Sequence, residues 1–180
     1  MRIALIFAST EGQTCKIAQY VQAYLIAEDH HTALISADAA MGLDLSPFDG
    51  VILAGSVHGG RYQPALVQAS KAHANTLNAI PSLFLSVSLA AAGDAAEDWK
   101  ELAAIVDRFK SETGWAPGRV EHVAGAFRFK DLSFVKYWAL RWIETQKDPD
   151  AVPGEDKEYT DWGQLSDVIE DWTTQVQTGR

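Results

Sequence analysis

Six small or polar residues near the N-terminus, Ser9-Thr10-Glu11-Gly12-Gln13-Thr14, have the composition of an anion-binding loop. They follow an apolar run and precede apolar residues at helical spacing. The loop should therefore lead into a helix N-terminus, where unpaired N–H groups and the helix dipole attract anions. Ser9, Thr10 and Thr14 supply hydroxyl donors, and Gly12 allows a tight turn. The loop predicts a phosphate site, but alone it is equally compatible with a helix that Thr10 or Thr14 simply caps.

The kind of phosphate follows from what this loop lacks. It contains no lysine, and it has neither the G-x-x-x-x-G-K-[ST] spacing of nucleoside triphosphatases nor the G-x-G-x-x-G spacing of dinucleotide-binding folds. Neutral donors without a cation suit the single phosphate of a monoester.

Two further loops are expected beside the first. Residues 56–62 contain two adjacent glycines, and residues 86–94 are rich in alanine; each loop follows an apolar run. The carboxyl ends of neighbouring parallel strands meet in one crevice of a doubly wound sheet. We therefore expect all three loops to line one ligand site, with His58 and Tyr62 as the ring side chains of the second loop.

The elements that position these loops are read from hydrophobic periodicity. Five apolar runs are typical of strands, several of them of strands buried on both faces: residues 3–7, 32–37, 50–56, 82–88 and 120–127. Helical patterns alternate with them, which predicts an α/β fold with a doubly wound, five-stranded parallel sheet in the order 2-1-3-4-5.

Three of the intervening helices have recognisable ends. One begins near Pro64, one ends at Gly114, and the last begins at Asp161, where Gln164 has the spacing of a capping box. The expected buried faces of the last two are Trp99, Leu102, Ala103, Val106 and Phe109, then Leu165, Val168, Ile169, Trp172 and Val176.

Composition limits the class of protein. The 180 residues fit one domain, 1–180, and 15 basic against 24 acidic residues give a net charge of -9, which disfavours nucleic acid. Cys15 is the single cysteine, so no internal disulfide forms. No apolar run approaches the ~20 residues of a membrane span, and no metal-ligand spacing is present. A cytoplasmic protein without a metal is expected.

Residues 128–160 interrupt the simple pattern, because such folds usually join a strand to the next helix in a few residues. We interpret them as an insertion with an aromatic helix over residues 132–143 and an acidic loop over residues 148–158. A helix that is aromatic on several sides requires a partner, which is a substrate, a membrane interface, another subunit or its own domain.

The S-T-x-G-x-T loop resembles the phosphate loop of flavodoxins, and the next two loops fall where flavodoxins hold the isoalloxazine ring. A wider resemblance, to the flavodoxin-type, menaquinone-dependent protoporphyrinogen oxidases of bacteria, covers nearly the whole chain. It includes residues 7–14, 55–62, 71–81, 125–129 and 159–162. It implies a flavodoxin-like fold of the long-chain type, bound flavin mononucleotide (FMN), and oxidation of protoporphyrinogen IX with a quinone as acceptor.

The resemblance also implies which residues hold the cofactor. The first loop would hold the phosphate, backbone groups of the other two would line the polar edge of the flavin, and His58 or Tyr62 would pack beside the ring. An exposed loop histidine is the alternative for His58. The expected cofactor residues are Ser9, Thr10, Glu11, Gly12, Gln13, Thr14, Ser56, Val57, His58, Gly59, Gly60, Tyr62, Ser86, Val87, Ser88 and Leu89.

Substrate contacts are expected from the insertion, at Arg128, Phe134, Tyr137 and Trp138. Peripheral contact with the cytoplasmic face of the inner membrane is a further expectation, weakened by the near balance of charges there. No catalytic side chain is assigned, because the cofactor carries the chemistry. The alternatives are an electron carrier without its own substrate, a quinone reductase fed by a nicotinamide cofactor, and a flavin-free domain that keeps only the fold.

Overall fold

The computed structural model describes residues 1–127 and 157–179. A five-stranded parallel sheet lies at its centre. The strands are β1 (Arg2–Ala8), β2 (His31–Ser36), β3 (Gly50–Ser56), β4 (Ser82–Ser88) and β5 (Arg119–Ala124). Their order across the sheet is β2-β1-β3-β4-β5. The predicted fold class and strand order are confirmed, and residues 50–56 and 82–88 form strands with the expected bounds.

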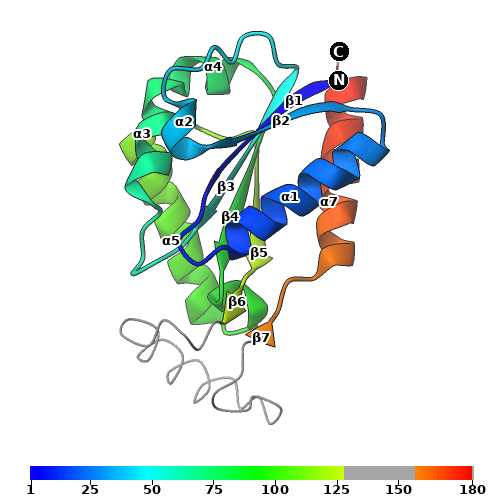
Figure 1. Ribbon diagram of the computed structural model, residues 1–180. Helices are drawn as coiled ribbons and strands as arrows, with labels where there is room; N and C mark the ends of the chain where they lie inside the picture. The colour runs from blue at the N-terminus through cyan, green and yellow to red at the C-terminus, as the bar shows by residue number, and fades with distance from the viewer. Residues whose placement is uncertain (128–156, 180) are drawn as a thin grey trace.

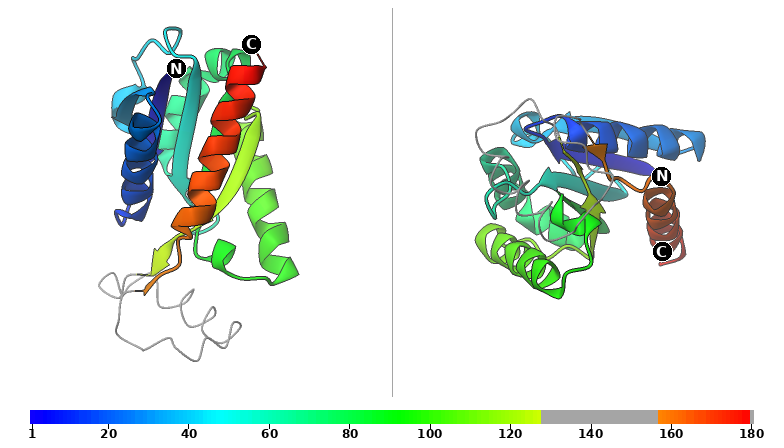
Figure 2. Two further views of the ribbon diagram at one scale, coloured as in Figure 1. Left: turned by 90° about the vertical axis from the view of Figure 1, so that its right-hand side faces the viewer. Right: turned by 90° about the horizontal axis from the view of Figure 1, so that it is seen from below.

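Helices cover both faces of the sheet, as Figure 1 and Figure 2 show. On one face lie α1 (Gln13–Ala27) and α7 (Trp162–Thr178). On the other lie α2 (Ala37–Ala40), α3 (Pro64–Ala72), α4 (Ala74–Ala79) and α5 (Ala96–Thr113). The short 3₁₀ turn η1 (Ala90–Ala92) follows β4 directly. Helices on both faces of the sheet explain why β3 and β4 are buried along almost their whole length.

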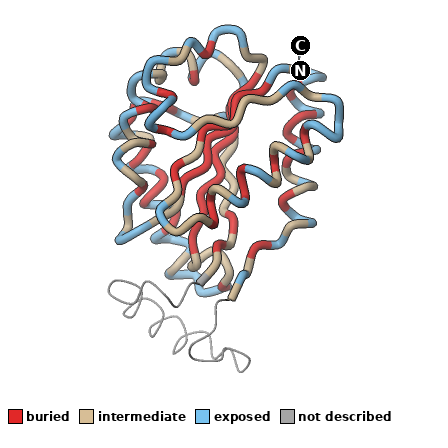
Figure 3. Tube along the Cα trace, in the orientation of Figure 1, coloured by how far each residue is buried: buried red, intermediate tan, exposed pale blue. Residues whose placement is uncertain are grey.

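The core therefore has two halves, one on each side of the sheet, and the central strands are buried along most of their length (Figure 3). Phe84 of β4, Phe109 of α5 and Trp115 pack together in one of these halves. The rings of Phe84 and Phe109 are stacked, with 5.0 Å between their centres. On the opposite face, Ile17 of α1 and Trp172 of α7 belong to the second cluster. The two halves hold the carboxyl ends of β1, β3 and β4 together at one edge of the sheet.

The fifth strand is shorter than predicted. The run 120–127 was expected to form one strand, but β5 ends at Ala124. After Gly125, β6 (Ala126–Phe127) leaves the central sheet and pairs antiparallel with β7 (Lys157–Glu158). Residues 126–127 leave the central sheet because they pair with a segment distant in sequence. An apolar run does not reveal such a pairing. Residues 128–156, most of the expected insertion, lie outside the described residues.

The buried face of α5 also differs from the prediction. Leu102, Val106 and Phe109 are buried as expected, but Trp99 is 40% exposed and Ala103 is exposed. The indole of Trp99 instead donates to the carbonyl of Gly93 at 2.8 Å, which anchors the start of the helix to the preceding loop. In α7, Val168 is only partly buried, and the other four predicted residues are buried.

Within residues 1–127 and 157–179, none of the helices combines the length and the apolar composition needed to cross a bilayer.

Candidate cofactor site

The first loop turns tightly between β1 and α1. Gly12 is the N-cap residue of α1 and has φ 91°, a left-handed conformation that favours glycine. No side chain caps this helix, so the interpretation that Thr10 or Thr14 is a plain cap is wrong. The first-turn N–H groups of a helix have no acceptor within the helix. They remain available to an anion, which the helix dipole also attracts.

The hydroxyl groups of the loop keep their hydrogens for a ligand. Ser9 Oγ accepts from Gly12 N at 3.0 Å, and Thr10 Oγ1 accepts from Gln63 Nε2 at 3.1 Å. Since both oxygens accept from N–H groups, each O–H hydrogen is left to point elsewhere.

Thr14 gives the sharpest test of whether a phosphate fits. The residue is 1% exposed, and its hydroxyl has no hydrogen-bond partner among the described residues. A buried polar group without a partner costs about 1–3 kcal/mol. A phosphate oxygen accepting from Thr14 would remove that cost, so the residues present fit the group that the sequence predicts.

The second loop is a tight hairpin turn. Gly59 and Gly60 have φ 55° and 73°, and His58 and Arg61 exchange backbone hydrogen bonds of 2.8 and 3.1 Å across them. Positive φ at both central residues is the requirement of a type I′ turn. The turn holds the His58 ring at the pocket wall.

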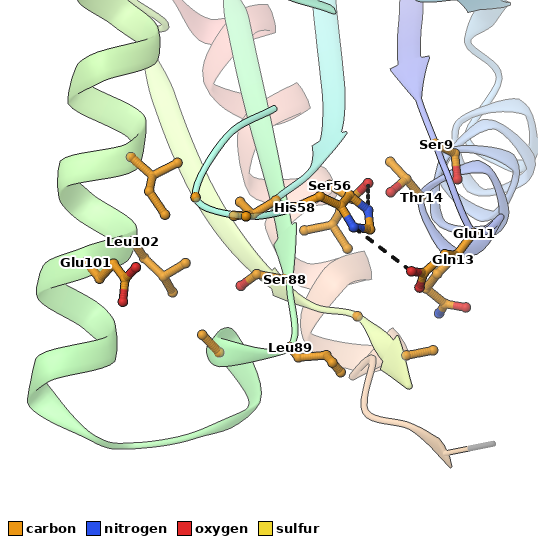
Figure 4. Close-up of a pocket in the computed structure, with 18 of the residues that line it drawn as sticks. Ser9, Glu11, Gln13, Thr14, Ser56, His58, Ser88, Leu89, Glu101 and Leu102 are labelled. Carbon is orange, nitrogen blue, oxygen red and sulfur yellow. Dashed lines mark hydrogen bonds and ion pairs between the residues drawn. The ribbon is translucent and has the colours of Figure 1, made fainter. Parts of the chain in front are cut away.

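His58 connects the first two loops, as Figure 4 shows. Its Nε2 lies 3.0 Å from Ser56 Oγ, and its Nδ1 lies 4.0 Å from Glu11 Oε1. The Ser56 hydroxyl also accepts from Gln63 Nε2 at 2.5 Å. Gln63 therefore bonds to both Thr10 and Ser56, a role that sequence reasoning missed because Gln63 lies beyond the glycine turn, at the start of α3.

Tyr62 and Ser86 lie behind the pocket rather than in it. The Tyr62 hydroxyl is 2.7 Å from Ser86 Oγ, and its ring packs edge-on against Phe84 and Phe109. Burial raises the pKa of Tyr62 to about 12. Both residues are part of the core, which leaves His58 as the ring side chain of this loop at the pocket.

The three loops converge on one pocket of about 170 Å³ (Figure 4). Val87, Ser88 and Leu89 reach it from the end of β4, where Ser88 Oγ accepts from Ala91 N at 3.2 Å. The lining residues that the sequence predicted are Ser9, Glu11, Gln13, Thr14, Ser56, Val57, His58, Gly59, Gly60, Val87, Ser88 and Leu89. Thr10, Gly12, Tyr62 and Ser86 do not line it.

One wall of the pocket comes from residues that the sequence analysis did not assign to the site. Asp98, Glu101, Leu102 and Ile105 project from α5, and Gly125 and Ala126 follow β5. A helix that follows β4 begins at the same sheet edge as the loops. The predicted topology could therefore have indicated that α5 contributes to the pocket. The two carboxylates give that wall a negative charge.

The expected substrate residues Arg128, Phe134, Tyr137 and Trp138 lie outside the described residues.

Residues 4–151 match the flavodoxin domain family, and the chain belongs to that family. FMN, the cofactor expected from the sequence, is thereby confirmed. Two solved structures share the fold. Oxidised flavodoxin 2 from Bacillus cereus is 21% identical with a TM-score of 0.54, covering 81% of this chain and 99% of that one. The apo form of an NADH:FMN oxidoreductase (EMOB) is 16% identical with a TM-score of 0.55, covering 97% and 89%.

Two curated relatives carry the same name, protoporphyrinogen IX dehydrogenase [quinone]. The protein of Escherichia coli strain K12 is 25% identical over 166 residues, covering 92% of this chain and 91% of the relative. That of Leishmania major is 22% identical over 169 residues, covering 93% and 73%.

Proposed function

We propose that the protein oxidises protoporphyrinogen IX to protoporphyrin IX with FMN as cofactor and a quinone as electron acceptor. The observation that carries the proposal is the near full-length similarity to relatives named for this reaction. The wider sequence resemblance, which includes the segments around Gly125 and Trp162, supports it as well.

The described residues have distinct tasks in this proposal. When bound, FMN would supply the redox chemistry, in which electrons pass from protoporphyrinogen IX to the quinone. The hydroxyls of Ser9 and Thr14, which line the pocket, and the first N–H groups of α1 would hold its phosphate. The turn at Gly59 and Gly60 and the end of β4 form walls of the pocket that would orient the flavin ring.

Orientation is the main contribution that these residues make to the rate. Holding reactants in one geometry removes much of the entropic barrier of a bimolecular step. The pocket wall is mostly apolar beside Leu89, Leu102 and Ile105, which favours an extended, weakly polar ring system over water. The macrocycle of a tetrapyrrole and the ring of a quinone both have apolar faces.

An anaerobic assay tests the proposal. Purified protein is mixed with protoporphyrinogen IX and a menaquinone analogue, and porphyrin fluorescence is followed against a protein-free control. We expect a quinone-dependent rate well above the uncatalysed one. Fluorescence that rises no faster than in the control would overturn the proposed reaction while leaving the cofactor assignment intact.

The insertion has a separate test, because its role stays a prediction. Trp138→Ala should raise the KM for protoporphyrinogen IX severalfold while the FMN content per chain stays at the wild-type value. An unchanged KM would remove Trp138 from the substrate site.

A second candidate function is an electron carrier without its own substrate. Asp98 and Glu101 on the pocket wall, with a net charge of -9, favour docking of a basic redox partner. Quinone-dependent porphyrin formation in the assay above decides against this candidate.

A further inference from the structure

A single carboxylate joins three elements beside the pocket. Glu158 Oε2, on β7, accepts from Lys16 Nζ at 2.6 Å and from Gln13 Nε2 at 3.2 Å. Its other oxygen accepts from Trp162 Nε1 at 2.9 Å, and the Lys16 ammonium also lies 5.1 Å from the centre of the Trp162 ring. We call Gln13, Lys16, Glu158, Thr160 and Trp162 the Glu158 cluster.

The cluster fixes the orientation of the Gln13 amide. A carboxylate can only accept, so the amide nitrogen must face Glu158. Thr160 Oγ1 donates to the Ala124 carbonyl at 2.7 Å, so it accepts from the same Gln13 nitrogen at 2.9 Å. With both N–H groups engaged, the amide cannot rotate by half a turn without losing these bonds.

The remaining polar atom of Gln13, its amide oxygen, has no partner in the part of the chain that the structure describes. Gln13 is 6% exposed and lines the pocket, and its Oε1 is buried without a hydrogen-bond partner among the described residues. An orphaned buried acceptor in a native protein calls for an explanation such as a missing ligand. FMN carries hydroxyl donors on its ribityl chain, directly next to the phosphate.

The same cluster also reaches the residues that follow β5. Glu158 pairs with Ala126 across β6 and β7, and Tyr159 N donates to the Gly125 carbonyl at 3.0 Å. Gly125 and Ala126 themselves line the pocket. The bonds of Glu158 therefore connect the first turn of α1, which binds the phosphate, to the β6–β7 pair.

We propose that Glu158 is a positioning residue that holds the Gln13 carbonyl ready for a donor of the bound cofactor and thereby couples the β6–β7 pair to cofactor binding. This inference rests on the FMN site of the proposed function. Because binding free energies are reciprocal, FMN must stabilise the β6–β7 pair as much as that pair favours FMN.

The direction in which Glu158→Ala changes the affinity for FMN separates this proposal from simple electrostatics. Glu158→Ala leaves the ammonium of Lys16, four residues after Gly12 in α1, without its counter-charge. An electrostatic role alone would then tighten binding of the anionic FMN. Loss of positioning weakens it instead. Riboflavin, which has the ribityl hydroxyls and no phosphate, isolates the positioning effect from the charge effect.

The experiment measures dissociation constants of FMN and riboflavin by flavin fluorescence in wild type, Glu158→Ala, Gln13→Leu and the double variant. We expect Glu158→Ala to weaken both ligands by about threefold to tenfold, the value of one net hydrogen bond. The double variant should bind no more weakly than Gln13→Leu. Glu112→Ala is the control, because it removes an exposed ion pair with Lys71 at 4.0 Å.

Unchanged or tighter FMN binding in Glu158→Ala, or additive losses in the double variant, would overturn the proposal. A wild type that binds no FMN would instead contradict the cofactor site itself. Hydrogen exchange of the unmodified protein gives a check that needs no variant. FMN should slow exchange of the Tyr159 amide, and an FMN complex with unaltered exchange there would also overturn the coupling.

Discussion

Thr14 shows how a single side chain can signal a ligand. Threonine at a helix start is ordinarily explained as a cap, yet the cap of α1 is Gly12 and the Thr14 hydroxyl is buried without a partner in the described chain. Ser9 and Thr10 differ from it, since N–H groups of the protein already occupy their oxygens. Thr14 is therefore the hydroxyl that gains most from a phosphate.

Thr14→Val should lower FMN affinity by about tenfold or more, because a hydrogen bond to a charged group contributes about 1.5–3 kcal/mol. The apoprotein should be no less stable, since the variant removes an unsatisfied hydroxyl and keeps the shape. Thr178→Val at the end of α7, whose hydroxyl bonds only to its own helix, is the control. Wild-type FMN affinity in Thr14→Val, measured by fluorescence titration, would exclude this hydroxyl from the phosphate site.

Residue type and loop position predicted most of the pocket, and packing explains the exceptions. His58 and Tyr62 were indistinguishable in sequence, because both are rings in one glycine-rich loop. The structure places Tyr62 against Phe84 and Phe109, and only His58 at the pocket. Gln63 could not be anticipated, since its bonds to Thr10 and Ser56 depend on the angle at which α3 leaves the turn.

Among the helices and strands, those buried on both faces were the easiest to predict. Gly50–Ser56 and Ser82–Ser88 have the expected bounds, because short, mainly apolar runs bounded by glycine, proline or polar residues leave few alternatives. The break at Gly125 was not predicted. The apolar residues on both sides of it belong to different sheets, and pairing with β7 depends on residues more than thirty positions later.

The start of α7 gives a prediction for one element. Asp161 accepts from Gln164 N at 2.9 Å, as the capping-box spacing indicated. Asp161→Ala should reduce the free energy of unfolding by about 1 kcal/mol. Asp167→Ala, at an exposed position of the same helix, should change it by less than about 0.5 kcal/mol. Equal effects of the two substitutions in urea unfolding would contradict the cap.

The link between β7 and α1 predicts a pH dependence. The hydrogen bond from Lys16, followed by those from Trp162 and Gln13, lowers the pKa of Glu158 from its ordinary value of 4.5. A carboxyl whose pKa is lower in the folded state stabilises the protein above pH 4.5, and this stabilisation is lost as the pH falls through the folded pKa.

Unfolding of the apoprotein, followed between neutral and acid pH, checks this link. Wild type should lose more stability on the acid side than Glu158→Gln, which has no carboxyl to protonate. Parallel curves for the two proteins would contradict the assigned ion pair.

For the whole molecule, the net charge of -9 acts on every anionic ligand. FMN carries a phosphate, and the pocket also has carboxylates at Glu11, Asp98 and Glu101. Repulsion between charges of like sign weakens as salt screens it. The association rate of FMN with the apoprotein should therefore rise between low and moderate ionic strength, measured by stopped-flow fluorescence. A rate that falls with salt would mean that a local positive field outweighs the net charge.

The most direct measurement is a titration of the apoprotein with FMN and with riboflavin under identical conditions. If hydroxyl and N–H groups around Gly12 hold the phosphate, FMN should bind once per chain and at least about tenfold more tightly than riboflavin. Equal affinities for the two flavins, or no saturable binding of FMN, would contradict the account.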